Sequence, residues 1–186
     1  MSARAPSGLA WKLNRLRCMS PAEIGHRVAR AATMRAERWG LLRCVVPAPD
    51  LACAPQAWVH AGARVDAAPY AAAAERIAAG IHDVFALEGA QLGSPPRWNR
   101  DPRTGVEAPL AFGKQLDYRD PAVVGDCKYL WEPNRHLHFV TLAQAWALTG
   151  EARHAEVLRA HLESWIEACP FRLGANWASA LEPALR

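Results

Sequence analysis

The stretch "EPNRHLHFVTLAQAWALTGEARHAEVLRAHLESWIEAC", residues 132–169, decides the fold class. Pro133 stands near a first helical position and Gly150 has the place of a C-terminal cap, so the first half predicts one helix. After the cap, apolar residues recur at steps of three and four, which predicts a second, amphipathic helix. Only Thr149 and Gly150 join the two helices, and a connection this short predicts an antiparallel helix hairpin.

The two predicted helices differ in their patterning. Residues 139–148 are apolar nearly all round, which is typical of a helix that is buried on most of its sides. The second helix has one apolar stripe, expected to face the core, opposite a row of glutamates. The stripe consists of Ala155, Leu158, Leu162, Trp165, Ile166 and Cys169.

The segment that follows, "PFRLGANWASALEPALR" (170–186), predicts a third helix. Pro170 breaks the chain, and helical spacing resumes near Asn176. The apolar stripe of this helix needs a neighbouring surface to cover it; it consists of Ala178, Leu181 and Leu185. We therefore expect the third helix to pack beside the pair, and the sequence to be the N-terminal piece of a longer protein.

Two further segments are expected before this region, which spans 131–186. Residues 1–40 form a basic helical segment with eight Lys or Arg and two acidic residues. In it, Ser20, Pro21 and Glu23 have the spacing of a capping box at the start of a helix. Residues 41–130 are expected to mix helix and long loops.

Within the middle segment, strong helix formers predict a helix over about 70–83, followed by a short extended piece. The proline-containing stretch 45–68 is expected to be irregular, and so is 88–130, which is dense in Gly and Pro. A loop as long as the second one is usually functional or wrapped over the surface. A plain connector is the alternative.

Composition excludes several classes of protein. The chain has 186 residues and a net charge of +4, about half of its residues are apolar, and it contains no apolar run long enough to span a membrane. Heavy use of Ala and Arg with little Lys indicates a GC-rich, bacterial genome. The basic N-terminus carries no nucleic-acid-binding motif, and charge alone gives only non-specific binding, so nucleic acid is not an expected partner.

Neither the cysteines nor the histidines predict a metal or a cofactor. The five cysteines form no CxxC pair and are odd in number, which argues against a zinc ribbon and a disulfide framework. His136 and His138 stand two positions apart and point to different sides of a helix, so they do not share an ion easily. No metal ligands and no cofactor are therefore expected.

An ordered series of short motifs runs through the second half of the chain. The series comprises "WNRDPRTG" (98–105), "GDCKYLWE" (125–132), Trp131-Glu132-x-Asn134-Arg135, Leu142-Ala143-x-Ala145, Glu163-Ser164-Trp165-Ile166, and Gly174-x-Asn176-Trp177 with Glu182 and Arg186 beyond it. This series resembles the N-terminal helical domain of the heparinase II/III-like polysaccharide lyases. The resemblance covers residues 95–186 well and 18–40 loosely.

The resemblance implies an all-α fold, the incomplete start of an α/α toroid of antiparallel helix pairs with a long irregular loop region. In the family a β-sandwich domain follows the toroid, and the active cleft lies between the two. Family members cleave uronic-acid-containing polysaccharides, heparin- or heparan-like or related, by β-elimination. The implied partners are thus an acidic polysaccharide and the remainder of the same chain. No secretory signal is visible, which favours a cytoplasmic location, although family members are often periplasmic.

The chemistry of β-elimination explains the residue types of the implied site. Removing the C5 proton of a uronate builds negative charge beside a carboxylate, so that carboxylate must be neutralised or hydrogen-bonded. A Tyr or His takes the proton, and an acid protonates the leaving oxygen. By resemblance, Asn176 is the carboxylate neutraliser. The catalytic Tyr and His come from later segments, and Tyr118 and Tyr129 do not sit in the corresponding motif.

Each site residue has a structural alternative. Asn176 can cap the last helix. Trp131 and Trp177 can stack on sugars or pack in a core. Arg135 can bind a uronate carboxylate bidentately or pair with a glutamate of the chain, and His136 can bind substrate or lie at the rim of the core. The alternative function is a non-catalytic toroid module that binds acidic glycans or supports a partner domain.

Overall fold

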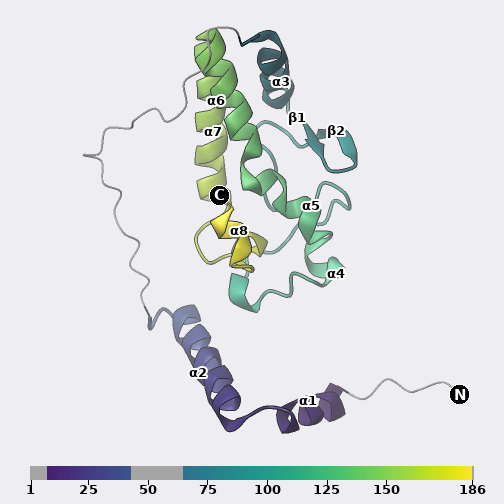
Figure 1. Ribbon diagram of the computed structural model, residues 1–186, viewed down its shortest axis with the longest axis vertical. Helices are drawn as coiled ribbons and strands as arrows, with labels where there is room; N and C mark the ends of the chain where they lie inside the picture. Colours follow the sequence, from purple (N-terminus) through teal and green to yellow (C-terminus); the bar gives the residue numbers. More distant parts are fainter. Residues whose placement is uncertain (1–7, 43–64, 186) are drawn as a thin grey trace, which may run out of the picture. The chain divides into compact units, whose positions relative to one another are not determined.

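The structure, a computed structural model, describes residues 8–42 and 65–185 and is mostly helical (Figure 1). The chain divides into two compact units, Met1–Ala54 and Pro55–Arg186, which are treated separately. The elements are α1 (Gly8–Arg17), α2 (Pro21–Arg38), α3 (Ala68–Ala78), β1 (Ile81–Val84), β2 (Leu87–Gln91), η1 (Gly113–Gln115), α4 (Pro121–Val124), α5 (Cys127–Trp131), η2 (Pro133–Arg135), α6 (Leu137–Thr149), α7 (Ala152–Ala168), η3 (Ala175–Trp177) and α8 (Leu181–Ala184).

The first unit contains α1 and α2, as the basic N-terminal segment predicts. Ser20 Oγ accepts a hydrogen bond from the backbone N–H of Glu23 at 3.2 Å, and Pro21 opens the helix, so the predicted N-cap is confirmed. The Glu23 carboxylate pairs with Arg27 at 2.8 Å one turn along. None of the residues of α2 is buried, and Trp39 after it is 69% exposed.

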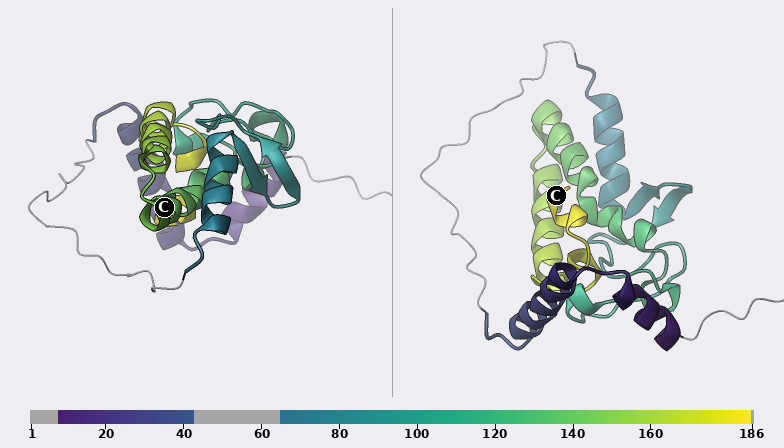
Figure 2. Two further views of the ribbon diagram at one scale, coloured as in Figure 1. Left: turned by 90° about the horizontal axis from the view of Figure 1, so that it is seen from above. Right: turned by 60° about the horizontal axis from the view of Figure 1, so that its bottom comes forward.

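The second unit is built around the predicted helix hairpin. Helices α6 and α7 run side by side, and α3 packs against α6 (Figures 1 and 2). One core cluster joins these elements, since Ala74 and Ile77 of α3 are buried against Leu142 and Ala145 of α6. The helix pair of the sequence analysis is therefore confirmed.

Helix α6 departs from the prediction at its start and in its burial. It begins at Leu137 and not at Pro133, because His136 has a left-handed backbone (φ 61°) that interrupts the helix after the 3-10 turn η2. The expected burial on most sides is wrong. Leu142 and Ala145 are the helix's buried residues, whereas Val140 and Trp146 are 55% and 50% exposed.

The face that helix α7 turns to the core overlaps only in part with the predicted stripe, since Leu158 packs against the first core cluster and Cys169 is buried. His154 and His161 are its buried residues, while Leu162 and Ile166 of the predicted stripe are 39% and 59% exposed. The buried face is thus rotated towards the two histidines. Their rings find partners in the core that the spacing of apolar residues does not reveal.

A β-hairpin corrects the all-α expectation. Helix α3 ends at Ala78 and not at 83, and Gly80 follows with φ 78°. A Cβ atom at Gly80 would lie 2.9 Å from the backbone of Gly93, so the turn needs glycine. Strands β1 and β2 then pair antiparallel, and the predicted short extended piece is one half of this two-stranded sheet.

The long region after β2 is irregular, as predicted, and hydrogen bonds within it hold it together. Asp101 is fully buried, and its carboxylate accepts the backbone N–H groups of Arg103, Thr104 and Asp126. A second core cluster lies beneath this region and consists of Ala108, Val124, Leu130, Trp131 and Ala175. The irregular stretch expected at 45–68 falls almost entirely outside the described residues.

The predicted third helix from Asn176 is wrong. Asn176 lies in the 3-10 turn η3, and an α-helix starts only at Leu181 and lasts four residues. Gly174 (φ 82°) precedes the turn, and Gly113 packs so closely on it that a Cβ atom there would lie 2.8 Å from the carbonyl carbon of Trp177. Helix α8 contacts η3. No helix among residues 8–42 and 65–185 is both long enough and apolar enough to cross a membrane.

Candidate functional site

Asn134 is the centre of a buried hydrogen-bonded group that joins the motifs of the sequence analysis. Its Oδ1 accepts from Trp165 Nε1 at 2.9 Å and from Asn176 Nδ2 at 3.0 Å. Its Nδ2 donates to the carbonyl oxygens of Trp98 at 2.9 Å and Leu130 at 2.7 Å. The carboxamide therefore uses both its donor and its acceptor atoms.

Cys169 completes this group, which we call the asparagine node: Asn134, Trp165, Cys169 and Asn176. Asn176 Nδ2 lies 3.2 Å from Cys169 Sγ, and both asparagines are fully buried. Because a buried amide is costly unless it is hydrogen-bonded, these partners fix the two side chains in place. Asn134 lies in η2, Trp165 in α7, Cys169 directly after α7 and Asn176 in η3, so the node joins α7 to the turns η2 and η3.

Asn176 is accordingly a buried member of the node. It is the middle residue of η3 and not an N-cap, so the capping alternative is wrong. Its side chain is 0% exposed. Contact between this amide and a polymer requires the covering residues to move.

Arg135 pairs within the chain. Its Nε and Nη2 donate to the two carboxylate oxygens of Glu182 at 3.1 and 3.0 Å, and its Nη1 donates to Glu132 at 2.8 Å. The hydrogen bonds with Glu182, which is itself 1% exposed, raise the pKa of Arg135 above its usual value. Arg135 thus already makes with a buried glutamate the bidentate pair that it would make with a uronate carboxylate.

The two candidate tryptophans differ. Trp131 is 8% exposed and donates from Nε1 to the carbonyl oxygen of Ala175 at 3.0 Å, which makes it a packing residue of the core. Trp177 is half-buried and donates to the carbonyl oxygen of Cys169 at 3.1 Å. The Trp177 ring meets Phe171 edge to face at 4.9 Å, and Phe171 is exposed, so this pair is the accessible aromatic surface near the node.

His136 lies at the rim of the core. Its ring stacks on Phe139 at 4.6 Å with an interplanar angle of 7°, and the edge of Trp165 meets it at 4.7 Å. The left-handed backbone at His136 turns the chain from η2 into α6. The structure therefore brings His136 next to the node through Trp165.

A group of histidines that sequence reasoning missed surrounds Trp98. His82, His138 and His161 come from β1, α6 and α7, and the His138 ring lies 5.3 Å from that of His82 and 5.6 Å from that of His161. Trp98 stacks on His138 at 5.9 Å. We call His82, His138 and His161 the histidine group.

The histidine group is poorly satisfied. Within the described residues, no hydrogen-bond partner reaches His82 Nε2, His138 Nε2 or His161 Nδ1, and Ser94 Oγ is the contact of His161 Nε2 at 2.9 Å. Burial lowers the pKa of His138 to about 2 and that of His161 to about 4, and it also lowers the pKa of His82. All three imidazoles are therefore neutral at physiological pH.

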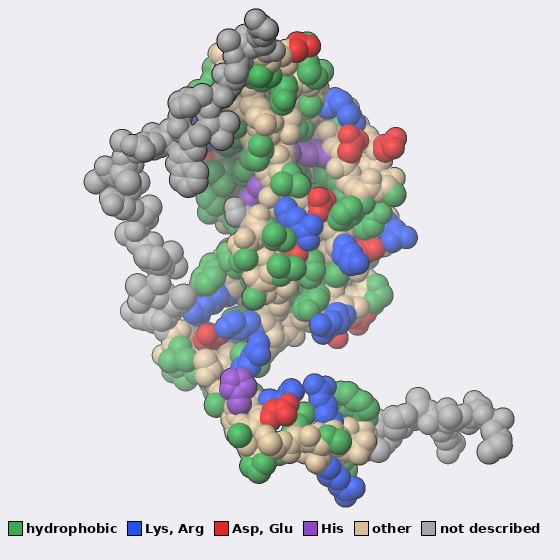
Figure 3. Space-filling view, viewed as in Figure 1, with side chains coloured by type: hydrophobic (Ala, Val, Ile, Leu, Met, Phe, Trp, Pro, Cys, Tyr) green, Lys and Arg blue, Asp and Glu red, His purple; other side chains and the backbone are tan. Residues whose placement is uncertain are grey.

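An open cleft lies beside the β-hairpin and borders the node. Its lining includes the charged residues Glu88, Arg97 and Arg100 together with Trp98 and Asn134. Arg97 pairs with Glu107, whereas the side chain of Arg100 has no ion pair within the described residues. On the face drawn in Figure 3, basic and acidic side chains lie interspersed over this unit.

Comparison of the chain with models of protein families, with curated proteins and with solved structures finds no match.

Proposed function

We propose that the chain is the N-terminal portion of a lyase that cleaves uronic-acid-containing polysaccharides, heparin- or heparan-like or related, by β-elimination. One observation carries the proposal. Three of the motif residues, Asn134, Trp165 and Asn176, are hydrogen-bonded into one buried node, and that node borders a cleft in which Arg100 has no ion pair within the described residues. An acidic polymer is the kind of ligand that such a cleft attracts.

The chemistry of β-elimination suggests a role for each of these residues. Arg100 attracts the carboxylates of the polymer in the cleft, next to Arg97, which is paired with Glu107. Asn176 donates its amide to the uronate carboxylate as charge builds on C5, after the residues that cover it have moved. The groups that move protons belong to the rest of the protein.

A second candidate function has its own supporting observation. Asn176 and Arg135 both use their polar atoms on internal partners, Asn134 and Glu182 respectively. A non-catalytic toroid module, which binds acidic glycans or supports a partner domain, needs these residues only for its own stability. The two functions make different predictions for one substitution.

The test compares Asn176→Ala with Ser164→Ala in the full-length protein. Ser164 Oγ accepts from Trp98 Nε1 at 3.1 Å, so its loss also breaks a hydrogen bond near the node. If Asn176 contacts the transition state, its variant loses about 10²–10³ in turnover at a temperature at which both variants are folded, as oxyanion-type donors typically do. The Ser164→Ala variant should keep near-normal turnover.

Turnover is followed by the ultraviolet absorbance of the unsaturated product, next to a thermal melt of each variant. Equal turnover of the two variants, scaled to their folded fractions, would reject the catalytic role of Asn176. A full-length protein without turnover on any uronate polymer would instead favour the non-catalytic module. The 186-residue chain alone should show no turnover.

The cleft is tested by binding. Arg100→Gln should weaken retention of the 186-residue chain on a polyuronate matrix at low salt, and added salt should abolish the difference because exposed charges are screened. Arg119→Gln is the matched control, since Arg119 is exposed but lies against Tyr118 and not in the cleft. Equal retention of the two variants would remove the cleft from the proposal.

A further inference from the structure

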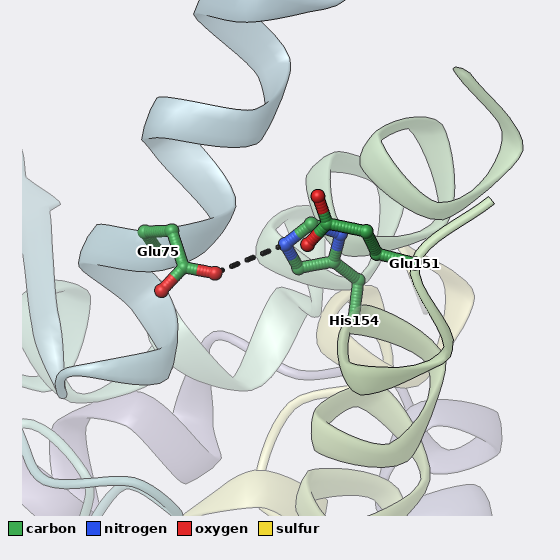
Figure 4. Close-up of side chains that lie close together, drawn as sticks. All are labelled: Glu75, Glu151 and His154. Atoms are coloured by element: carbon green, nitrogen blue, oxygen red, sulfur yellow. Dashed lines mark hydrogen bonds and ion pairs between the residues drawn. The ribbon is translucent and has the colours of Figure 1, made fainter. Parts of the chain in front are cut away.

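A second group of ligand-type side chains lies away from the node and the cleft, where α3 faces the start of α7. Glu75 belongs to α3, while Glu151 and His154 stand at the N-terminal end of α7 (Figure 4). Glu151 and His154 are three positions apart, which places them on one side of a helix. The spacing Glu-x-x-His is a known way to aim a carboxylate and an imidazole at one ion.

The three side chains converge. One ligand atom from each of them lies within 4.8 Å of the other two. His154 Nε2 is 3.2 Å from Glu75 Oε1, and in Figure 4 the Glu151 side chain is directed towards the same imidazole. In a tetrahedral zinc site with bonds of about 2.0–2.2 Å, neighbouring ligand atoms are roughly 3.3–3.6 Å apart, so only small side-chain shifts separate this arrangement from a coordination shell.

His154 is the buried member of the three. Its side chain is fully buried and is directed at Glu75, and its Nδ1 has no hydrogen-bond partner within the described residues. A carboxylate at neutral pH can only accept, so a hydrogen bond to Glu75 puts the proton on Nε2 and leaves a buried, unpaired lone pair on Nδ1. Nε2, the nitrogen that faces Glu75, can bind a metal ion in the same direction once the ring proton resides on Nδ1, and Nδ1 loses no hydrogen bond in that change.

We propose that Glu75, Glu151 and His154 bind a divalent transition-metal ion of the Zn²⁺ type. The ion binds His154 Nε2 and Glu75 Oε1 in place of the proton between them, and the imidazole carries its proton on Nδ1 instead. Glu151 is the third protein ligand, and water completes the shell. Imidazole and carboxylate ligands suit Zn²⁺. The site joins α3 to α7, and it is independent of the proposed lyase function.

Arg153 supports the arrangement from outside. Its Nη1 donates to Glu75 Oε2 at 2.6 Å, which holds the carboxylate with Oε1 towards His154. Hydrogen bonds of this kind to a ligating carboxylate orient it for the metal. The two glutamates supply two negative charges for the dication, and Arg153 offsets part of the charge on Glu75.

The experiment uses the 186-residue chain, freed of metal by a chelator and kept reduced. Co²⁺ and Zn²⁺ are titrated separately, with visible absorption for Co²⁺ and calorimetry for Zn²⁺. We expect one Co²⁺ per chain with a spectrum that lacks the near-ultraviolet thiolate band, because no cysteine takes part. Bound Zn²⁺ should also raise the melting temperature, since it binds the folded state.

Glu151→Gln is the decisive variant, with Glu156→Gln as its control. Both glutamates are exposed, and the Glu151 side chain makes no cap hydrogen bond, so both variants should fold. We expect Glu151→Gln to weaken binding at least tenfold and Glu156→Gln to leave it unchanged. Equal affinity of wild type and Glu151→Gln, a thiolate spectrum, or no binding by the wild type would each overturn the proposal.

Discussion

The asparagine node and the histidine group are both buried and polar, and both lie against Trp98, yet they satisfy their polar atoms differently. In the node, Asn134 hydrogen-bonds through both its amide nitrogen and its amide oxygen. In the histidine group, three ring nitrogens have no hydrogen-bond partner within the described residues. The two carboxamides of the node do not titrate, whereas the imidazoles can take up protons.

This difference separates two ways of keeping polar groups in a core. A carboxamide has one fixed donor group and one fixed acceptor, so a set of partners can specify a single geometry. An imidazole without partners is tolerated only as the neutral ring, because burial penalises the charged form. The node should therefore determine stability at all pH values, and the histidine group should determine its loss in acid.

The largest effect is expected for Asn134→Ala. This variant leaves Trp165 Nε1 and the Asn176 amide without their acceptor and two backbone carbonyl oxygens without a donor. Since each unsatisfied buried group costs about 1–3 kcal/mol, we expect the free energy of unfolding to fall by about 3–5 kcal/mol. Denaturant unfolding of the 186-residue chain measures it.

Gln144→Ala is the control for Asn134→Ala, because it deletes an exposed amide from α6. Its free energy of unfolding should stay within about 0.5 kcal/mol of that of the wild type. A loss for Asn134→Ala as small as this would mean that the node contributes nothing to stability.

A smaller effect is expected for Asn176→Ala. It removes one donor from Asn134 and the contact with Cys169, and we expect a loss of about 1–3 kcal/mol in the free energy of unfolding. In a double-mutant cycle with Asn134→Ala, the coupling energy should be about 0.5–3 kcal/mol, because the two side chains share a hydrogen bond. If the two losses in the free energy of unfolding simply add in the double variant, the two asparagines do not act as a unit.

The histidine group should have its effect only in acid. The unfolded chain binds protons on these imidazoles near pH 6.5, whereas the folded chain does so near pH 4 at His161 and near pH 2 at His138. The unfolded state thus holds more protons below pH 6.5, and stability must fall as the pH falls from 6.5 towards 4 and, for His138, towards 2. Asp83 beside His82 partly offsets the burial of that ring.

The acid effect is checked with His138→Phe. Phenylalanine keeps an aromatic ring beside Trp98 and does not titrate, so stability at neutral pH should change by less than about 1.5 kcal/mol. Below pH 6.5 the variant should lose stability less steeply than the wild type in melts at a series of pH values. Parallel pH profiles for the two proteins would show that His138 does not titrate on unfolding.

The structural features that depend on residues close together in the sequence were predictable. The Ser20 cap, the turn at Gly150 and the pairing of the two long helices follow from residues within a few positions of one another. The irregular course of 88–130 was also predictable from its Gly and Pro content. Asn134 stood inside a quoted motif, but nothing in its neighbourhood assigned it a central place.

The sequence by itself determined helix α2 and the hairpin of helices α6 and α7. Helix capping and apolar periodicity depend on residues within one or two helical turns of one another. Only the tertiary structure decided the hairpin of β1 with β2, the inward face of α7 and the short turn at Asn176. Each of these depends on a partner distant in sequence: Gly80 meets Gly93, His161 meets Ser94, and Asn176 meets Asn134. A buried polar side chain is placed by the partner that satisfies it, and that partner is known only once the chain has folded.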